Sequence, residues 1–391
     1  MSSLVSFTNK IFQTKQSHYL AESGIEDSYY RMRVGIPVSG DPITLPEGIT
    51  SIVVTDTDSS HKKIDTSGLV SGMTRKTELN LLNSNFITFN QGLLADTGGV
   101  FMKSTSSVGG NIYSNGSITG VFGAASAGDV YVSGTMGVMY DMNIGAGGAA
   151  NAHAYKVSGT TVSGTIYCQY GIGNSAPCDT SESLPSVEPL PINDTSITLW
   201  KNDAVLGGVI MGDHVVSTLE MLGPKKIVGN LHVVNHGSLS LSGTLWVTGD
   251  VIFDGTPDGS STNLSGIYGS NGGMIIADGK ITINPNVALS GSGILGSEIM
   301  LLSTLACDET NSSPPCFGNN SITVNSHEVH ALLYAKDGTI DFEGSSNFKF
   351  ANANKIRLKS GVNLNYSAVP EGIFFGGGSS SWVPTLWKEV E

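Results

Sequence analysis

Two spacings of apolar residues divide the chain into regions of different structure. In residues 1–35, apolar side chains recur every three or four positions, which is the spacing of one stripe along a helix. Asp27 and Arg31 stand four residues apart and are expected to pair. The GIPVSG stretch at 35–40 ends the predicted helix. The stripe, which can pack on the helix's own domain or against sister helices, comprises Leu4, Phe7, Ile11, Ala21, Ile25, Tyr29 and Met32.

Residues 36–82 change to a strand pattern. The stretches ITSIVVTDT, KKIDTSG and TRKTELNLL are rich in β-branched residues and are separated by turn residues. The alternation in TELNLL predicts one face in contact with water. This region is therefore expected to be a small antiparallel β domain laid on the end of the helix. Gly24, inside that helix, should weaken it by about 1 kcal/mol relative to alanine.

Residues 83–391 consist of many short stretches that alternate apolar and polar residues and end in Gly or Asn. Loose repetition of this kind predicts a right-handed parallel β-solenoid, in which each coil buries its inward residues on the next coil. A β-sandwich is the alternative, because its strands would be spaced similarly. The inward residues expected in the clearest stretch are Leu231, Val233, Leu239, Leu241, Leu245, Val247, Val251 and Phe253.

The solenoid rhythm is interrupted at 168–195. Four prolines between Pro177 and Pro191 predict an irregular surface excursion. The stretch SITLWKNDAVLGG that follows is expected to form a short helix that caps or crosses the solenoid, with Ser196 as its N-cap.

Composition limits the classes of function. The 391 residues carry a net charge of −13, and no run of Lys and Arg is interleaved with aromatic residues, so nucleic acid is not an expected partner. Four cysteines form two close pairs around loops, Cys168 with Cys178 and Cys307 with Cys316. They are candidate disulfides, with four free buried thiols as the alternative. Disulfides would place the protein outside the cytoplasm.

Export requires a targeting signal that the sequence does not display. The chain contains no signal peptide and no apolar run of the roughly 20 residues that a membrane span needs. We therefore expect a segment upstream of Met1 in the full-length protein.

Several stretches resemble a known family. SHYLAESGIEDSYYRMR, at 17–33, is similar to the end of the N-terminal helix of PilX-type, type IV pilin-like proteins, and SGMTRKTELNL, at 71–81, resembles the strand that follows it. The glycine-rich remainder looks like the β-solenoid bodies of such proteins. The resemblance implies a helix whose apolar first half is anchored in the membrane, pilin subunits as partners through that helix, and a place at the cell surface.

Enzymatic chemistry is not expected. The acidic residues Asp250, Asp254, Asp258, Asp278, Asp337 and Asp341 mostly stand beside glycine, as aspartates in turns do. Lys355, Arg357 and Lys359 alternate and are expected on one solvated strand face, and His327 and His330 would point to opposite faces of a strand. No catalytic residue, metal site or cofactor is predicted.

Trp382 and Trp387 lie in the last ten residues. They are expected to plug the open end of the solenoid, or to serve as a platform on which a glycan stacks. The prediction as a whole is a non-enzymatic, exported, type IV pilus-associated structural or adhesive protein, with glycans or a host surface as candidate partners. The alternatives are a secreted carbohydrate-binding or carbohydrate-cleaving β-helix protein and a scaffold that polymerises end to end.

Overall fold

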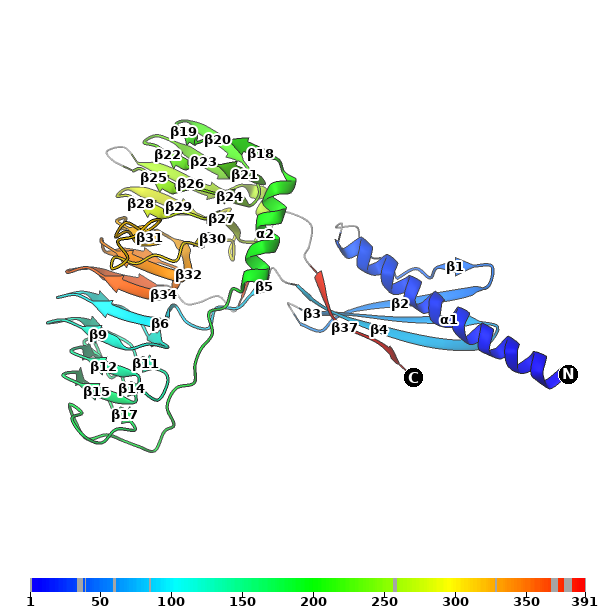
Figure 1. Ribbon diagram of the computed structural model, residues 1–391, viewed down its shortest axis with the longest axis horizontal. Helices are drawn as coiled ribbons and strands as arrows, with labels where there is room; N and C mark the ends of the chain where they lie inside the picture. Colours follow the sequence, from blue (N-terminus) through cyan, green and yellow to red (C-terminus); the bar gives the residue numbers. More distant parts are fainter. Residues whose placement is uncertain are drawn as a thin grey trace. The chain divides into compact units, whose positions relative to one another are not determined.

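The chain forms two compact units in the computed structural model, which describes residues 2–33, 38, 40–58, 61–83, 86–255, 259–327, 329–366, 372–375 and 382–390. The side chains of residues 2–6 and 33 fall outside this description. Unit 1 combines residues 1–86 with 378–391, and unit 2 contains residues 87–377 (Figure 1). The protein is mainly β, as predicted.

Unit 1 packs helix α1 (Ser2–Arg33) on a five-stranded antiparallel sheet. The strand order is β1-β2-β3-β4-β37. The strands are β1 (Thr44–Leu45), β2 (Gly48–Asp56), β3 (His61–Val70), β4 (Met73–Asn83) and β37 (Trp382–Val390). The helix and the small antiparallel sheet confirm the prediction for the N-terminal part of the chain.

The prediction that the two tryptophans plug the open end of the solenoid is wrong. β37 pairs with the edge of β4, with Trp382 opposite Asn83 and Trp387 opposite Leu79, so neither tryptophan closes the solenoid. β4 offers the backbone groups of an 11-residue strand on that edge, and pairing satisfies them. The solenoid is consequently inserted between β4 and β37, whereas the sequence prediction placed residues 83–391 in one body.

Small residues bring α1 unusually close to the sheet. Ser17, Ala21, Gly24 and Ser28 are buried on the helix face toward the strands. Thr50 Oγ1 donates to the Leu20 carbonyl at 2.6 Å, and Thr66 Oγ1 donates to the Ala21 carbonyl at 2.7 Å. A Cβ added at Gly24 would lie 2.7 Å from Thr50 Cγ2. Gly24 therefore permits the contact between helix and sheet, in addition to its expected cost to the isolated helix.

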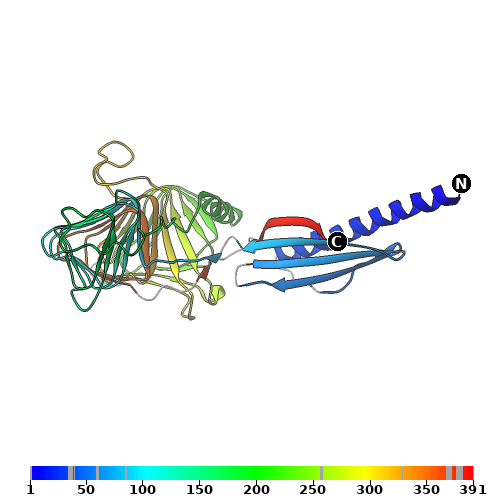
Figure 2. The same ribbon diagram turned by 90° about the horizontal axis from the view of Figure 1, so that it is seen from below.

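Unit 2 is a solenoid whose coil strands pair in parallel, which excludes the β-sandwich. Each coil contributes strands to three faces in turn; Figure 2 views the stacked coils from one end. The first face comprises β8 (Ile112–Ser114), β11 (Val130–Val132), β14 (Ala152–Ala154), β17 (Ile166–Cys168), β18 (Val209–Met211), β21 (Lys225–Val228), β24 (Leu245–Val247), β27 (Gly273–Ala277) and β30 (Ile299–Ser303). The second face comprises β9 (Ile118–Gly120), β12 (Val138–Tyr140), β15 (Lys156–Ser158), β19 (His214–Val216), β22 (Leu231–Val233), β25 (Val251–Phe253), β28 (Ile281–Ile283) and β31 (Ile322–Val324).

Three long strands bend across the corner and join the first two faces into one sheet: β6 (Leu93–Met102), β32 (Ala331–Phe342) and β34 (Phe350–Leu358). The third face comprises β7 (Ser107–Val108), β10 (Ala125–Ser126), β13 (Asn143–Ile144), β16 (Thr161–Val162), β20 (Leu219–Leu222), β23 (Ser238–Leu241), β26 (Ser260–Leu264), β29 (Val287–Ser290), β33 (Ser346–Phe348) and β35 (Asn363–Tyr366). The remaining elements are β5 (Phe86–Ile87), which pairs with β36 (Ile373–Phe374), and a 3₁₀ turn at Gly266–Tyr268. All eight predicted inward residues from Leu231 to Phe253 are fully buried, which confirms the coil pattern there.

The coils do not stack in the order of the sequence. The chain enters at β6, in the middle of the stack, and winds to β17 at one end. Residues 169–208 then return along the outside to β18 at the other end (Figure 1). The later coils wind back until β34 pairs with β6 and β35 pairs with β7. The first coil is therefore covered on both sides by other coils.

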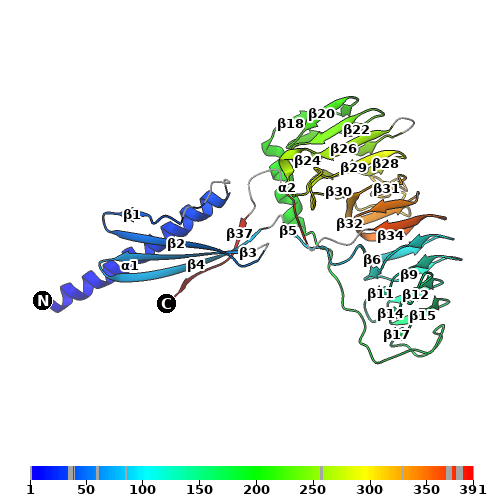
Figure 3. The same ribbon diagram turned by 180° about the vertical axis from the view of Figure 1, so that it is seen from behind.

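The return segment includes helix α2 (Asp194–Leu206), which runs along the stack over the first face (Figures 1 and 3). Its N-cap is Asn193, whose side chain accepts from the Ser196 backbone N–H at 2.9 Å, so the predicted cap at Ser196 is three residues late. Trp200 packs with Ile276, Leu302 and neighbouring residues in one buried cluster. Strands β27 and β30 are buried on both sides as a result.

The two ends of the stack are closed differently. At the β17 end, the loop after Cys168 bonds to the last coil, because Ser175 N–H donates to the Val157 carbonyl at 3.0 Å and Asn174 Oδ1 accepts from Val157 N–H at 2.9 Å. At the β18 end, His214 and Glu220 occupy inward positions that are Leu231 and Leu239 in the next coil. Their side chains meet at 2.8 Å and close the core with a polar pair.

A ladder of Asn and Asp side chains fixes one corner of the coils. Asn230 Oδ1 accepts from Asp250 N–H in the next coil at 2.7 Å, and Asp250 Oδ1 accepts from Lys280 N–H at 2.9 Å. Asn111 and Asp129 make the same contacts in the other half of the stack. Asp250, which the sequence predicted as a turn residue, thus joins two coils.

Gly68→Ala should destabilise unit 1. The added Cβ would lie 2.1 Å from the Ser17 carbonyl oxygen, so α1 would have to move away from the sheet, at a cost of about 1–3 kcal/mol. Hydrogen exchange of β2–β4 would measure the change in the free energy of unfolding. Gly40→Ala, whose Cβ would stand 3.7 Å from the Ile52 carbonyl oxygen, is the control. Equal protection in both variants would contradict the close contact.

Asp250→Ala should lower the free energy of unfolding of unit 2 by about 1 kcal/mol, because Lys280 N–H loses its acceptor. Asp250→Asn should keep most of that stability, since Asn fills the equivalent position 230. Thermal unfolding of the two variants would test this, with a difference of about 2 °C expected. The ladder would have no energetic role if the two variants melted together.

Candidate functional site

Helix α1 has two halves with different surroundings. Leu20, Ala21, Ile25 and Met32 are buried against the sheet of unit 1. Toward the N-terminus, Phe7 is 65% exposed and Ile11 is 44% exposed.

The predicted stripe is therefore divided. Ala21, Ile25 and Met32 pack on the helix's own domain, and Tyr29 is half-buried beside them. Phe7 and Ile11 remain on the surface, while the side chain of Leu4 lies outside the described residues.

A second exposed row on α1 was not predicted. Phe12, Tyr19 and Tyr30 are 62%, 65% and 62% exposed. Their spacings of 7 and 11 residues are close to two and three helical turns, so the three side chains lie on one face of the helix. The signal was present in the sequence, but the apolar stripe that begins at Leu4 dominated the pattern. This aligned row is a candidate interaction surface.

Ion pairs lie within α1 and between the last strand and its neighbours. Arg31 Nε donates to Asp27 Oδ2 at 2.7 Å, which confirms the predicted pair. Glu389 of β37 lies 3.2 Å from Arg75 Nη1 of β4 and 3.9 Å from His18 Nδ1 of α1. Glu389 thereby ties the C-terminal strand to β4, and its carboxylate lies near the helix.

The tryptophans do not form a paired surface. Trp382 is 9% exposed and belongs to the core of unit 1, with Lys62 Nζ 5.3 Å from its ring centroid. Trp387 is 45% exposed on β37. Burial of Trp382 leaves no stacking platform made by both rings.

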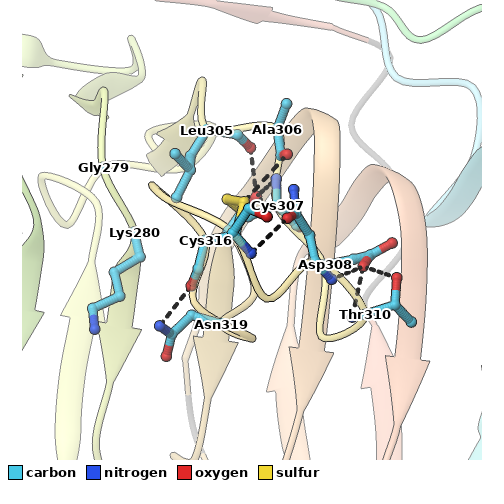
Figure 4. Close-up of a disulfide and its surroundings, with 12 residues drawn as sticks. Gly279, Lys280, Leu305, Ala306, Cys307, Asp308, Thr310, Cys316 and Asn319 are labelled. Carbon is cyan, nitrogen blue, oxygen red and sulfur yellow. Dashed lines mark hydrogen bonds between the residues drawn. A yellow bond between two sulfur atoms is a disulfide. The ribbon is translucent and has the colours of Figure 1, made fainter.

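Both predicted cysteine pairs are bonded, Cys168 to Cys178 and Cys307 to Cys316. The first disulfide fastens the loop that closes the β17 end of the stack. The second fastens a loop on the second face, where Asn319 Nδ2 donates to the Cys316 carbonyl at 2.7 Å and Thr310 bonds to Asp308 (Figure 4).

That second loop also buries a charge cluster. Glu309 Oε1 lies 3.0 Å from Lys355 Nζ and 3.1 Å from Arg357 Nη1. Arg357 donates to both oxygens of the fully buried Asp341, at 2.9 and 2.6 Å. The predicted solvated face of Lys355, Arg357 and Lys359 is therefore wrong for Arg357, whose side chain is 12% exposed, because the disulfide loop covers it.

The other candidate acids are also engaged in contacts. Burial alone would raise the pKa of Asp254, but hydrogen bonds from His232 at 2.5 Å and Asn284 at 2.7 Å outweigh it and lower that pKa. Asp278 binds Lys201 and Trp246. Asp337 and His327 are exposed, and Asp258 lies outside the described residues.

The described part of the chain has neither a membrane-spanning helix nor a metal-binding cluster. None of its helices is long and apolar enough to cross a membrane. Within the same residues, no group of three or more His, Cys, Asp and Glu side chains is arranged to hold a metal ion.

Comparison with known proteins adds one solved structure. No protein-family model matches the chain, and no curated protein matches it. The crystal structure of the competence-associated pilin ComZ from Thermus thermophilus aligns over 97% of this chain and 97% of that one, at 10% identity and a TM-score of 0.28.

The exposed part of α1 is thus the candidate functional surface of unit 1. It combines Phe7 and Ile11, which continue the buried stripe beyond the sheet, with the row of Phe12, Tyr19 and Tyr30. A partner that packed along this helix would remove these side chains from water, at about 25 cal/mol for each Å² of apolar surface buried.

Proposed function

We propose that this protein is an exported, non-enzymatic, type IV pilin-like subunit that displays a β-solenoid as a structural or adhesive body. The observation that carries the proposal is the division of α1. One half of the helix packs on its own sheet, and the other half leaves Phe7, Ile11 and Phe12 exposed for sister helices. The resemblance of residues 17–33 to pilin-like helices supports the same function.

The insertion of the solenoid between β4 and β37 supports the proposal that unit 1 displays unit 2. The strands on either side of the insertion are neighbours in the sheet of unit 1, joined along most of β37. A large body can therefore leave and re-enter unit 1 without interrupting its sheet. Unit 1 would serve assembly, and unit 2 would be the part presented to the surroundings.

The two disulfides support an extracellular location, because such bonds persist in oxidising compartments. Each also fastens a loop that the solenoid needs. A location at the cell surface fits both the disulfides and a role in a filament.

The non-enzymatic part of the proposal is supported by the state of the candidate acids. Asp341 is neutralised by Arg357, Asp254 binds His232 and Asn284, and Asp250 joins two coils. A glycoside hydrolase would need two carboxyl groups that face a substrate across an open site. These three side chains are used in holding the solenoid together.

Filaments sheared from cells that make the protein would test the proposal. The wild-type protein should be recovered with the filaments. Phe12→Asp should reduce recovery tenfold or more, because burying a charge in place of a phenyl ring costs more than the roughly 1.4 kcal/mol that a factor of ten requires.

Phe122→Asp is the matched control, because Phe122 is 88% exposed on the solenoid. It should assemble like the wild type, and circular dichroism should show both variants folded. Wild-type protein found free in the medium and absent from the filaments would refute the proposal, as would normal assembly of the Phe12→Asp variant.

A further inference from the structure

One outward row of the first face runs the length of the stack. Its register pairs lead from Lys226 and Trp246 to Tyr113, Tyr131, His153 and Tyr167 at the β17 end. The return segment covers the middle of this row with the apolar side of α2. Toward the β17 end it runs beside the row as an extended strap, residues 182–188, from Gln169 and His153 to Asn115.

The strap and the row border an open groove of about 600 Å³. The floor is an aromatic stack of Tyr113, Tyr131, His153 and Tyr167, with successive ring centroids 5.7, 4.6 and 4.6 Å apart and interplanar angles of 18–19°. Because the rings cover one another's faces, they present their edges to the groove. Asp129 and Asn151 of the coil corner form one wall, and Glu182–Ser186 of the strap form the other.

The strap is held at both ends. Asn115 Nδ2 donates to the Glu188 carbonyl at 2.7 Å, and Glu188 N–H donates to Asn115 Oδ1 at 3.0 Å. Gln169 Nε2 donates to the Glu182 carbonyl at 3.0 Å. The groove therefore has two fixed walls.

Three of the four floor side chains make polar contacts within the groove. Tyr131 O–H donates to Asp129 Oδ2 at 3.1 Å, and Tyr113 O–H donates to the Ser186 carbonyl. His153 Nδ1 lies 3.2 Å from Glu182 Oε2, and burial lowers the pKa of His153, which favours the neutral ring. Phenol and carboxylate oxygens can each accept further hydrogen bonds. The groove thus offers acceptors to a ligand that brings donors.

The groove is also negatively charged. Asp129 and Glu182 stand on its walls, and among its described lining residues there is no Lys or Arg. Under α2, the same face holds ammonium groups that belong to the chain itself. There Lys201 Nζ lies 2.5 Å from Asp278 Oδ1, Trp246 Nε1 donates to Asp278 Oδ2 at 2.8 Å, and Lys226 Nζ lies 3.8 Å from the Trp246 ring centroid. A carboxylate of this face thus already holds an ammonium group of the chain itself, Asp278 with Lys201.

We propose that the groove between the strap and the aromatic stack binds an aliphatic ammonium group from outside the chain. The group can come from a free polyamine or from a lysine side chain of another protein. The site is independent of the proposed filament function, since every groove residue belongs to unit 2.

Titration calorimetry on the whole chain would test the proposal with three probes: spermidine, Nα-acetyl-lysine methylamide and the neutral 1,8-octanediol. Spermidine should bind, more weakly as salt rises, and the diol should not. Binding of the lysine derivative as well would identify a protein partner as a source, and binding of spermidine alone would identify a free polyamine.

Each test variant replaces a carboxylate by an amide of the same shape and so removes one negative charge. Glu182→Gln and Asp129→Asn should each weaken spermidine binding about tenfold. Asn at 129 can still accept from Asn151 N–H, as Asn230 does from Asp250 N–H. Asp213→Asn is the control, because Asp213 makes the same ladder contact with Asn230 N–H outside the groove.

Failure of both ammonium probes to bind wild-type protein would overturn the proposal. Equal binding to the wild type and to both groove variants would overturn it too. Neither result would alter the recovery of the protein with filaments, so the two proposals fail separately.

Discussion

Every coil of unit 2 depends on its neighbours, because a single coil can neither bury its inward side chains nor satisfy its backbone groups alone. This dependence makes the ends of the stack the vulnerable points. The chain starts in the middle of the stack, so its first coil is not an end: β6 is covered on one side by β8 and β9 and on the other by β34. A disulfide-fastened loop closes one end, and the His214–Glu220 pair lies over the core at the other.

Starting in the middle obliges the chain to return along the outside of the stack. The return segment then forms a second layer on the first face. This layer is apolar at α2 and polar at the strap. The groove exists because the return segment is an extended strap here and a helix elsewhere. A continuous helix over the whole face would have filled the space that the strap leaves open, so topology and the candidate ligand site have one origin.

In unit 1 the corresponding constraint is the close contact of α1 with its sheet. Threonine hydroxyls from β2 and β3 reach helix carbonyls, which is possible only because glycine and other small residues face each other there. Phe12, Tyr19 and Tyr30 lie on another face of the helix, away from this contact. One helix can thus be fixed firmly to its own domain and still offer Phe12, Tyr19 and Tyr30 to a partner.

Local patterns in the sequence were sufficient for the helix at the N-terminus, the antiparallel strands after it, the coil texture with its inward residues from Leu231 to Phe253, and the two cysteine pairs. Each of these depends on spacing between residues close in the chain. The consecutive apolar residues in MIIA and IMLL also carried a usable sign that those strands are covered on both faces.

Only the tertiary structure decided where distant segments meet. Periodicity fixes which side of a strand is apolar, but the choice of neighbour depends on which edges are free once the rest of the chain has folded. For that reason β37 pairs with β4 and Trp382 is buried in unit 1, Arg357 is covered by a loop that begins near Cys307, and the coil that comes first in sequence lies in the middle of the stack.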